Sequence, residues 1–263
     1  MEKIRINKSA ERALDLLVLL AKADSALTLN EICIEMDMPK SSGFELVQTL
    51  LYKGFIEMDD SRLKTYRLGL AAFETGMAYQ TNMEITQLAR PFLLELNKQT
   101  GSTVFLGVED KGKVVYLDKA ENFSVMRPTA KLGSRRFLHT TGVGKALLAA
   151  MPDEKIEYLY SDGEISRKTP FSMVTMSDIL LDMKGIRERG YSIDDREDNE
   201  EMYCMGSAIF DQANQPVGAI SIASVYSSLT PERKEMVSKL ITETALKLSN
   251  QLGYSGKKLY VNI

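Results

Sequence analysis

One segment near the N-terminus, residues 39–53, carries polar side chains that suit recognition of DNA. Lys40 can pair with a phosphate, Glu45 can accept a hydrogen bond from a cytosine amino group, and Phe44 can contact a thymine methyl group. Serines near a helix N-terminus suit phosphate oxygens. The alternative is a solvated helix face with Phe44 partly buried. The residues predicted to face DNA are Lys40, Ser41, Ser42, Phe44, Glu45, Gln48, Arg62 and Lys64.

Start signals predict that this segment is the second helix of a helix-turn-helix. Thr28 and Glu31 form a T-x-x-E capping box, which begins the preceding helix. Pro39 takes the first helical position of the second helix, where its missing N–H costs nothing. A further helix over residues 9–21, with Ser9 as its N-cap, completes a three-helix core.

Two short strands follow and predict a winged helix-turn-helix, in which the second helix reads the major groove. Gly54 ends the reading helix as a left-handed cap. Residues 55–58 and 65–68 are the expected strands, and the loop between them is the wing. Arg62 and Lys64 in this loop suit backbone phosphates, although an ordinary solvated turn explains them equally well.

A second candidate site lies at a predicted helix that begins at Gly142. The residues around it resemble a phosphate-binding loop only superficially, because that motif needs Ser or Thr where Ala146 follows Lys145. ATP binding is therefore not expected. Glycines at a helix N-terminus instead form an anion site that suits a carboxylate. Arg136 can add a bidentate contact, and a surface Arg is the alternative.

After residue 101 the apolar period changes to two, which predicts strands in an α+β domain with an antiparallel sheet. The predicted strands cover residues 103–108, 113–118, 125–131, 202–210 and 217–225. The predicted helices cover residues 70–99, broken near Pro91, then 142–151, 153–160, 176–189 and a last helix capped by Thr230 that runs to about Leu252.

Composition places the chain among ordinary globular proteins of about two domains. No apolar run approaches the ~18 residues of a membrane span, and a cytoplasmic location is the expectation. The net charge is −3, and residues 1–70 hold ten Lys or Arg against eleven Asp or Glu, so DNA affinity should be modest for each protomer. Cys33 and Cys204, with one His, cannot make a disulfide framework or a zinc site.

The sequence resembles the IclR family of bacterial transcription regulators over almost its whole length. In the first half the resemblance rests on SAERAL at residues 9–14, MPKSS at 38–42 and YRLG at 66–69. In the second half it rests on three further matches, HTTGVGKA at 139–146, RGYS at 189–192, and Cys204 followed by IFD at 209–211. Each match is weak alone, but their order and spacing together are specific.

This resemblance implies a winged-helix DNA domain over residues 1–70, a linker helix over 71–89 and a GAF-like effector domain over 90–263. It also implies a homodimer, often paired into a homotetramer, that binds a double-stranded DNA operator and responds to a small metabolite. Where the family usually carries Arg in the reading helix this chain has Glu45, and Ala223 replaces a pocket serine, so a different operator is expected.

The resemblance also implies where the effector binds. The pocket is expected at Gly142 and Val143, with Asp194, Cys204 and Ser221 from other segments, and most of the acidic run after Asp194 is expected to be a solvated loop. Flanking positions match less closely. The predicted effector-binding residues are Val125, Pro128, Arg136, Gly142, Val143, Asp194, Cys204 and Ser221.

The resulting hypothesis is a regulator, more a repressor than an activator, that responds to a sugar acid or keto acid and needs no cofactor. No catalytic residues are predicted, because no Ser or Cys nucleophile pattern accompanies His139, which is expected to be structural or to form a pocket wall. Two alternatives stay open. One is a small-acid hydrolase that uses His139 and Asp194, and the other is a scaffold that has lost DNA binding.

Overall fold

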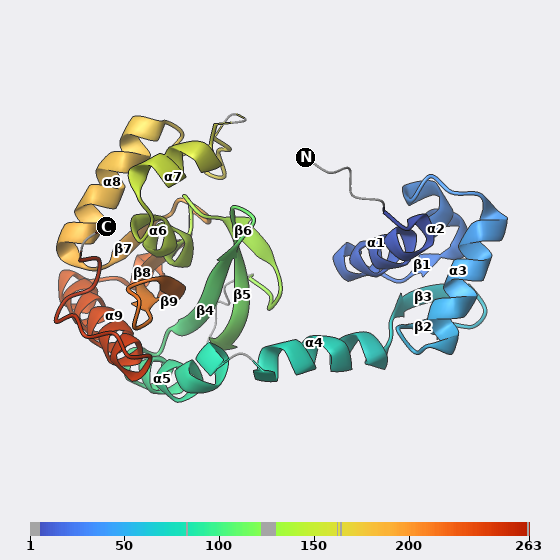
Figure 1. Ribbon diagram of the computed structural model, residues 1–263, viewed down its shortest axis with the longest axis horizontal. Helices are drawn as coiled ribbons and strands as arrows, with labels where there is room; N and C mark the ends of the chain where they lie inside the picture. The colour runs from blue at the N-terminus through green and yellow to red at the C-terminus, as the bar shows by residue number, and fades with distance from the viewer. Residues whose placement is uncertain (1–5, 83, 122–129, 162, 164, 262) are drawn as a thin grey trace. The chain divides into compact units, whose positions relative to one another are not determined.

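The computed structural model describes residues 6–82, 84–121, 130–161, 163, 165–261 and 263, and it divides into two compact units, residues 1–82 and 83–263 (Figure 1). Within the described residues, no helix combines the length and apolar character needed to cross a membrane.

Three helices form the first part of the N-terminal unit. They are α1 (Lys8–Lys22), α2 (Leu29–Glu35) and α3 (Lys40–Tyr52). The predicted capping box of Thr28 and Glu31 is confirmed. Two cap assignments are wrong by a residue or two. Asn7, not Ser9, caps α1 by accepting from two backbone amides, and Pro39 has an extended ψ of 144° that makes it the N-cap of α3, not its first residue.

A three-stranded antiparallel sheet completes this unit as a winged helix. Its strands are β1 (Leu27–Thr28), β2 (Ile56–Asp60) and β3 (Thr65–Leu68), in the order β1-β3-β2. Gly54 has the predicted positive φ of 72°. The helices α2 and α3 approach closely at Gly43, where a Cβ atom would lie 2.4 Å from the Cys33 Sγ, so only glycine fits there.

Two helices follow the wing, and they differ from the predicted single helix broken near Pro91. They are α4 (Leu70–Asn82) and α5 (Glu84–Thr100), and α5 continues through Pro91. A proline inside a helix forfeits one backbone hydrogen bond, at a cost of about 3 kcal/mol. Burial of Leu93 and Leu96 from α5 in the core of the C-terminal unit offsets that cost.

An antiparallel sheet organises the C-terminal unit, as predicted, and it has six strands rather than the five expected. Its order is β6-β5-β4-β9-β8-β7. The prediction missed two strands, β6 and β7. Residues 125–129 of the expected strand 125–131 lie outside the described residues, and neither Ala130 nor Lys131 is in a strand. The strands are β4 (Thr103–Asp110), β5 (Lys113–Ala120), β6 (Arg135–Phe137), β7 (Ser192–Asp195), β8 (Met202–Phe210) and β9 (Pro216–Val225).

Helices cover both faces of this sheet (Figure 1). On one face α5 packs beside α9 (Pro231–Gln251). On the other lies α6 (Gly142–Ala149), with α8 (Met176–Arg189) packed against it. The predictions for α8 and β8 match the structure residue for residue. The remaining helical segments are α7 (Asp153–Leu159) and the 3-10 turn η1 (Tyr226–Ser228).

The C-terminal tail closes part of the sheet. The short β7 pairs with β8 only as far as Gly206. Beyond that point the N–H of Ala208 donates to the hydroxyl of Tyr260 at 2.8 Å, and the Tyr260 ring packs edge-on against Phe210. A side chain from the tail therefore takes the place of the missing strand.

Candidate functional site

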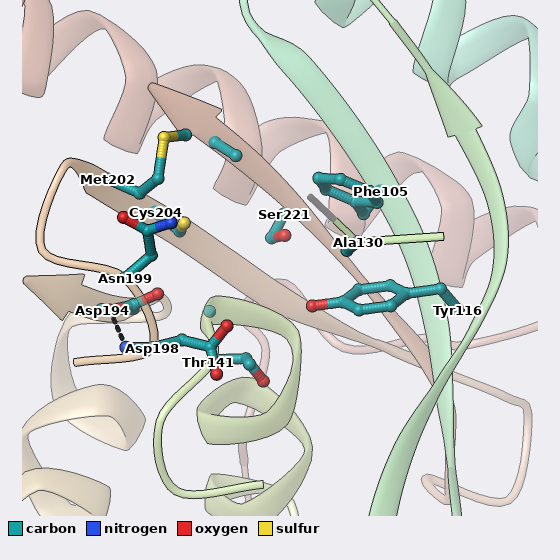
Figure 2. Close-up of a pocket in the computed structure, with 12 residues that line it drawn as sticks. Phe105, Tyr116, Ala130, Thr141, Asp194, Asp198, Asn199, Met202, Cys204 and Ser221 are labelled. Atoms are coloured by element: carbon teal, nitrogen blue, oxygen red, sulfur yellow. Dashed lines mark hydrogen bonds between the residues drawn. The ribbon is translucent and has the colours of Figure 1, made fainter. Parts of the chain in front are cut away.

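A small pocket lies where the start of α6 meets the sheet; its cavity volume is about 40 Å³, and it opens partly to solvent (Figure 2). The lining residues are Phe105, Tyr116, Ala130, Thr141, Gly142, Asp194, Asp198, Asn199, Met202, Cys204, Ser221 and Ala223.

Neighbouring strands bring the polar side chains together by register. Asp194 of β7 pairs with Cys204 of β8, which pairs with Ala223 of β9. Directly opposite residues on antiparallel strands point to the same face, so these three side chains form one row across the pocket. Figure 2 shows a carboxyl oxygen of Asp194 and the hydroxyl of Tyr116 pointing toward one another from opposite sides.

Glycines let the N-terminus of α6 approach this row closely. A Cβ atom on Gly142 would lie 3.1 Å from the Cys204 Cβ, and one on Gly206 would lie 2.4 Å from the Gly142 carbonyl oxygen. Thr141 caps the helix by accepting from the Gly144 N–H. The first amides of a helix have no intrahelical acceptor. The N–H groups of Gly142 and Val143 are therefore available to an anion.

Asp194 is the most perturbed carboxyl of the pocket. It is 2% exposed, and its Oδ1 accepts hydrogen bonds from the Glu197 N–H at 2.7 Å and the Asp198 N–H at 3.4 Å. Burial raises its pKa to about 8, although the Glu197 N–H acts in the opposite direction. Burial and the neighbouring Asp194 also raise the pKa of the Cys204 thiol, which therefore lacks the thiolate character of a nucleophile.

A buried ion cluster lies behind the pocket. Lys145 of α6 is only 1% exposed, and its Nζ contacts Glu197 at 2.5 Å and Asp182 of α8 at 2.9 Å. Asp182 also contacts Arg189 at 3.2 Å. Burial raises the pKa of Glu197 even though the Lys145 ammonium favours the ionised form. This cluster ties α6, α8 and the loop after β7 together.

Further contacts fix the loop that follows β7. The hydroxyls of Thr169 and Ser172 donate to the carbonyl oxygens of Arg196 and Glu197, each at 2.7 Å. The Arg196 guanidinium lies over the Phe171 ring, 3.9 Å from its centroid. This loop carries Asp198 and Asn199, so its fixed backbone holds one wall of the pocket. The expectation of a solvated loop is therefore wrong at Glu197, which is 4% exposed and pairs with Lys145, whereas Asp194 was expected in the pocket.

Four of the predicted effector-binding residues come together in this pocket, and they are Gly142, Asp194, Cys204 and Ser221. The side chain of Val143 lies instead against the backbone of Gly107 on β4, so this residue can offer only its N–H. Arg136 is on β6 and does not line the pocket. Val125 and Pro128 lie outside the described residues. Ligand contact by any of these residues stays a prediction.

Several lining residues were missed by sequence reasoning. Phe105 and Tyr116 belong to strands that were predicted, and their alternation would have placed them on one face. Asp198 and Asn199 were assigned to a solvated run. Lys145, in the ion cluster behind the pocket, was also missed. Its sequence signal was the clearest, because it is the only charged residue in the otherwise small or apolar helix Gly142–Ala149.

His139 is buried and does not line the pocket. It is 1% exposed, its Nδ1 lies 3.2 Å from the Tyr160 hydroxyl, and its Nε2 lies 2.9 Å from the Ser166 carbonyl oxygen. Burial lowers its pKa, which favours the neutral ring.

The second candidate site is the exposed face of α3. Lys40, Ser41, Phe44, Glu45 and Gln48 are exposed, with Phe44 at 52%, whereas the side chain of Ser42 is half-buried. Phe44 thus keeps about half of its surface exposed, which fits both the DNA-facing prediction and the alternative of a solvated face. A DNA contact from this face stays a prediction.

A groove between α1 and α3 adds a cation that sequence reasoning missed. Ser9 and Arg12 of α1 line it together with Ser42 and Glu45 of α3. The acidic Glu45 therefore lies near a basic neighbour, which reduces its repulsion of a phosphate.

The wing presents two free cations and one that is neutralised. Arg67 forms ion pairs of 2.7 Å with Glu57 and with Asp59, so its charge is satisfied within the sheet. Arg62 and Lys64 are exposed and make no ion pair with any described residue. These two remain the wing's candidates for phosphate contact.

Comparisons with known proteins match both units. Residues 9–60 match the model of the IclR helix-turn-helix domain, and residues 77–250 match that of the bacterial transcriptional regulator IclR C-terminal domain. The HTH-type transcriptional repressor AllR of Escherichia coli K12 is 32% identical over 246 residues, which cover 94% of this chain and 90% of that protein.

Solved structures share the fold. The Thermotoga maritima IclR structure has a TM-score of 0.79 and 29% identity, and covers 94% of this chain and 99% of its own. An IclR homologue from Microbacterium hydrocarbonoxydans, solved in complex with 4-hydroxybenzoate, has a TM-score of 0.81, 17% identity and coverage of 93% and 98%. At that identity the second likeness concerns the fold alone.

Proposed function

Because the chain belongs to the IclR family of bacterial transcription regulators, we propose that it is a repressor whose hold on operator DNA depends on a small organic acid bound beside α6. The observation that carries the proposal is the presence, in one chain, of an exposed polar α3 face and a pocket at a helix N-terminus. The proposed place of action is the cytoplasm, where the operator lies.

The DNA-binding role is supported by the form of the N-terminal unit. A winged helix inserts the second helix of its helix-turn-helix, here α3, into the major groove, and the exposed residues of α3 are suited to base edges. Lys40, Arg62 and Lys64 supply phosphate contacts in this proposal. With so few cations, affinity for DNA depends on two copies acting together. The exposed Leu70 and Phe73 of α4 are candidates for the surface that joins them in a homodimer, which can pair further into a homotetramer.

The effector role is supported by the pocket's polar groups. The amide of Gly142, which lines the pocket, and that of the adjacent Val143 suit a carboxylate, and the hydroxyls of Tyr116 and Ser221 suit the remaining oxygens of a sugar acid or keto acid. The 4-hydroxybenzoate in the Microbacterium homologue is itself a small carboxylic acid. An acid that prefers one arrangement of the DNA-binding units over the other changes operator affinity by that difference.

Fluorescence anisotropy with DNA from upstream of the protein's own gene tests the proposal. We expect sequence-dependent binding that weakens with salt and changes with at least one acid from a panel of sugar acids and keto acids. Lys64→Ala should lower the slope of log affinity against log salt by about 1. Lys247→Ala, which removes the same charge from an exposed position on α9, is the matched control and should leave the slope unchanged.

Binding no tighter than to random DNA, with every acid inert, would refute the proposal. It would favour a scaffold, or a hydrolase if a conversion assay detected turnover of one of the acids.

A further inference from the structure

The pocket presents an electrostatic problem for an acidic ligand, and this inference rests on the proposed function. No Lys or Arg occurs among the described lining residues, whereas two carboxyl groups, Asp194 and Asp198, do. The nearest buried ammonium, that of Lys145, is already paired with Glu197 and Asp182. An organic anion would therefore enter a site whose only ionisable groups are acids.

The geometry of Asp194 offers a solution. Both backbone amides that reach this carboxyl donate to Oδ1, so Oδ1 is fixed as an acceptor. The second oxygen is left to face the pocket (Figure 2). It is also the side that a ligand at the N-terminus of α6 would meet, because Asp194, Cys204 and Gly142 line the same space.

We propose that Asp194 carries a proton on this second oxygen in the complex and donates it in a hydrogen bond to the effector carboxylate. The proton comes from solvent, or is already present in the free pocket, and no covalent bond changes. Asp194 thereby discriminates between a carboxylate, which accepts this hydrogen bond, and ligands that lack the charge. The N–H groups of Gly142 and Val143 hold the other carboxylate oxygen.

Energetics favour this arrangement over a charged Asp194. Two carboxylates in contact at a buried site repel each other, as in paired-carboxyl sites where one group keeps its proton. A hydrogen bond from a neutral O–H to a carboxylate is charge-assisted and roughly twice as strong as a bond between neutral groups. The contact between Asp194 and the effector carboxylate is thus repulsive when Asp194 is ionised and strongly attractive when it is protonated.

The surroundings of Asp194 set the pH range of this effect. Burial dominates and raises the pKa of Asp194 to about 8, and the Glu197 N–H and the Lys145 charge lower it. Apparent affinity for a carboxylate should therefore be nearly constant below about pH 8 and fall about tenfold per pH unit above it. The charged and titratable groups that face Asp194 are Glu197 and Asp198 in its loop, Cys204 on β8, Tyr116 on β5 and Lys145 on α6.

A pair of probes and one isosteric variant test the inference. Lactate supplies a carboxylate, and lactamide is its uncharged counterpart of nearly the same shape. Binding of each to the full chain is measured by calorimetry from about pH 6.5 to about pH 9.5. For the wild type, lactate affinity should fall about tenfold between about pH 8.5 and pH 9.5, and lactamide affinity should not fall. Asp194→Asn keeps an acceptor for both amides and donates an N–H without titrating, so its lactate affinity should be independent of pH.

The matched control is Asp198→Asn, which removes the other pocket carboxyl. The lactate affinity of this variant can differ from that of the wild type, but the change in affinity per pH unit should be the same. A flat wild-type profile, an unchanged slope in Asp194→Asn, or failure of the wild type to bind lactate at about pH 6.5 would overturn the inference. Operator binding is measured separately. A negative result with lactate would therefore overturn only the role of Asp194, whereas the proposed regulatory function would be overturned by absence of operator binding.

Discussion

Replacing Lys145 by methionine should destabilise the C-terminal unit strongly, because it removes the cation from a buried cluster. The ammonium is 1% exposed and lies within 2.9 Å of both Glu197 and Asp182. Without it, two carboxylates remain no more than about 5 Å apart, and they repel by about 3 kcal/mol at an effective dielectric constant of about 20. Removing one partner of a buried ion pair typically costs about 3–5 kcal/mol, which agrees with this figure.

The loss should depend on pH with a definite sign. Burial already raises the folded-state pKa of Glu197 above 4.5, and loss of Lys145 raises it further. The folded state then binds a proton more tightly than the unfolded chain, so stability falls as pH rises from the unfolded to the folded pKa. The deficit of Lys145→Met should therefore shrink as the pH is lowered from neutral toward the ordinary glutamate pKa of 4.5.

Hydrogen exchange followed by mass spectrometry reports on the C-terminal unit alone and is suited to this measurement. Protection of the β8 amides should drop by about two to nearly four orders of magnitude, which is 3–5 kcal/mol expressed as an equilibrium constant. Adding Glu197→Gln should recover part of the loss, since Asp182 keeps Arg189 as a partner. Lys247→Met, at an exposed position of α9, is the control and should change stability by no more than about 0.5 kcal/mol.

A drop in protection of less than about tenfold would refute the reasoning, since it would mean that water or side-chain movement compensates the two carboxylates. A second refuting result would be a further loss on adding Glu197→Gln to Lys145→Met.

Three other substitutions give direct checks. Gly206→Ala should abolish ligand binding and lower thermal stability, because its Cβ would lie 2.4 Å from the Gly142 carbonyl oxygen, and calorimetry measures both effects. Thr28→Ala should cost about 1 kcal/mol by removing the N-cap of α2, as measured by exchange of the α2 amides. Tyr260→Phe should cost about 1–3 kcal/mol, seen as faster exchange in β8, because it leaves the Ala208 N–H buried without an acceptor. A normal melting temperature for Gly206→Ala, or wild-type exchange for the other two, would contradict these expectations.

Sequence reasoning located most elements because their local signals agreed with the tertiary fold. The Thr28–Glu31 capping box is a local interaction, and it formed as expected. The helix Met176–Arg189 is bounded by Thr175, which caps its start, and Gly190, which takes a left-handed φ of 86° at its end. Such signals do not depend on distant residues.

The errors arose where distant contacts decide the outcome. Pro91 is a strong local helix breaker, yet burial of the α5 face in the core keeps the helix continuous. No strand was predicted at Ser192–Asp195, where the acidic run begins, but pairing with β8 makes this segment a strand. The pairing of β7 with β8 is what places Asp194 in the pocket. The residue could be named from family resemblance, but its partners could not be derived from spacing.

The contact between Tyr260 and Ala208 bears on how the protein is made. Synthesis proceeds from the N-terminus, so β8 emerges some fifty residues before the side chain that accepts from its Ala208 N–H. Until Tyr260 has left the ribosome, this stretch of β8 can accept a strand from another nascent chain. A tag or fusion joined directly after Ile263 would lie close to Tyr260 and could disturb its contact with Ala208. An N-terminal tag is therefore preferable for producing the C-terminal unit.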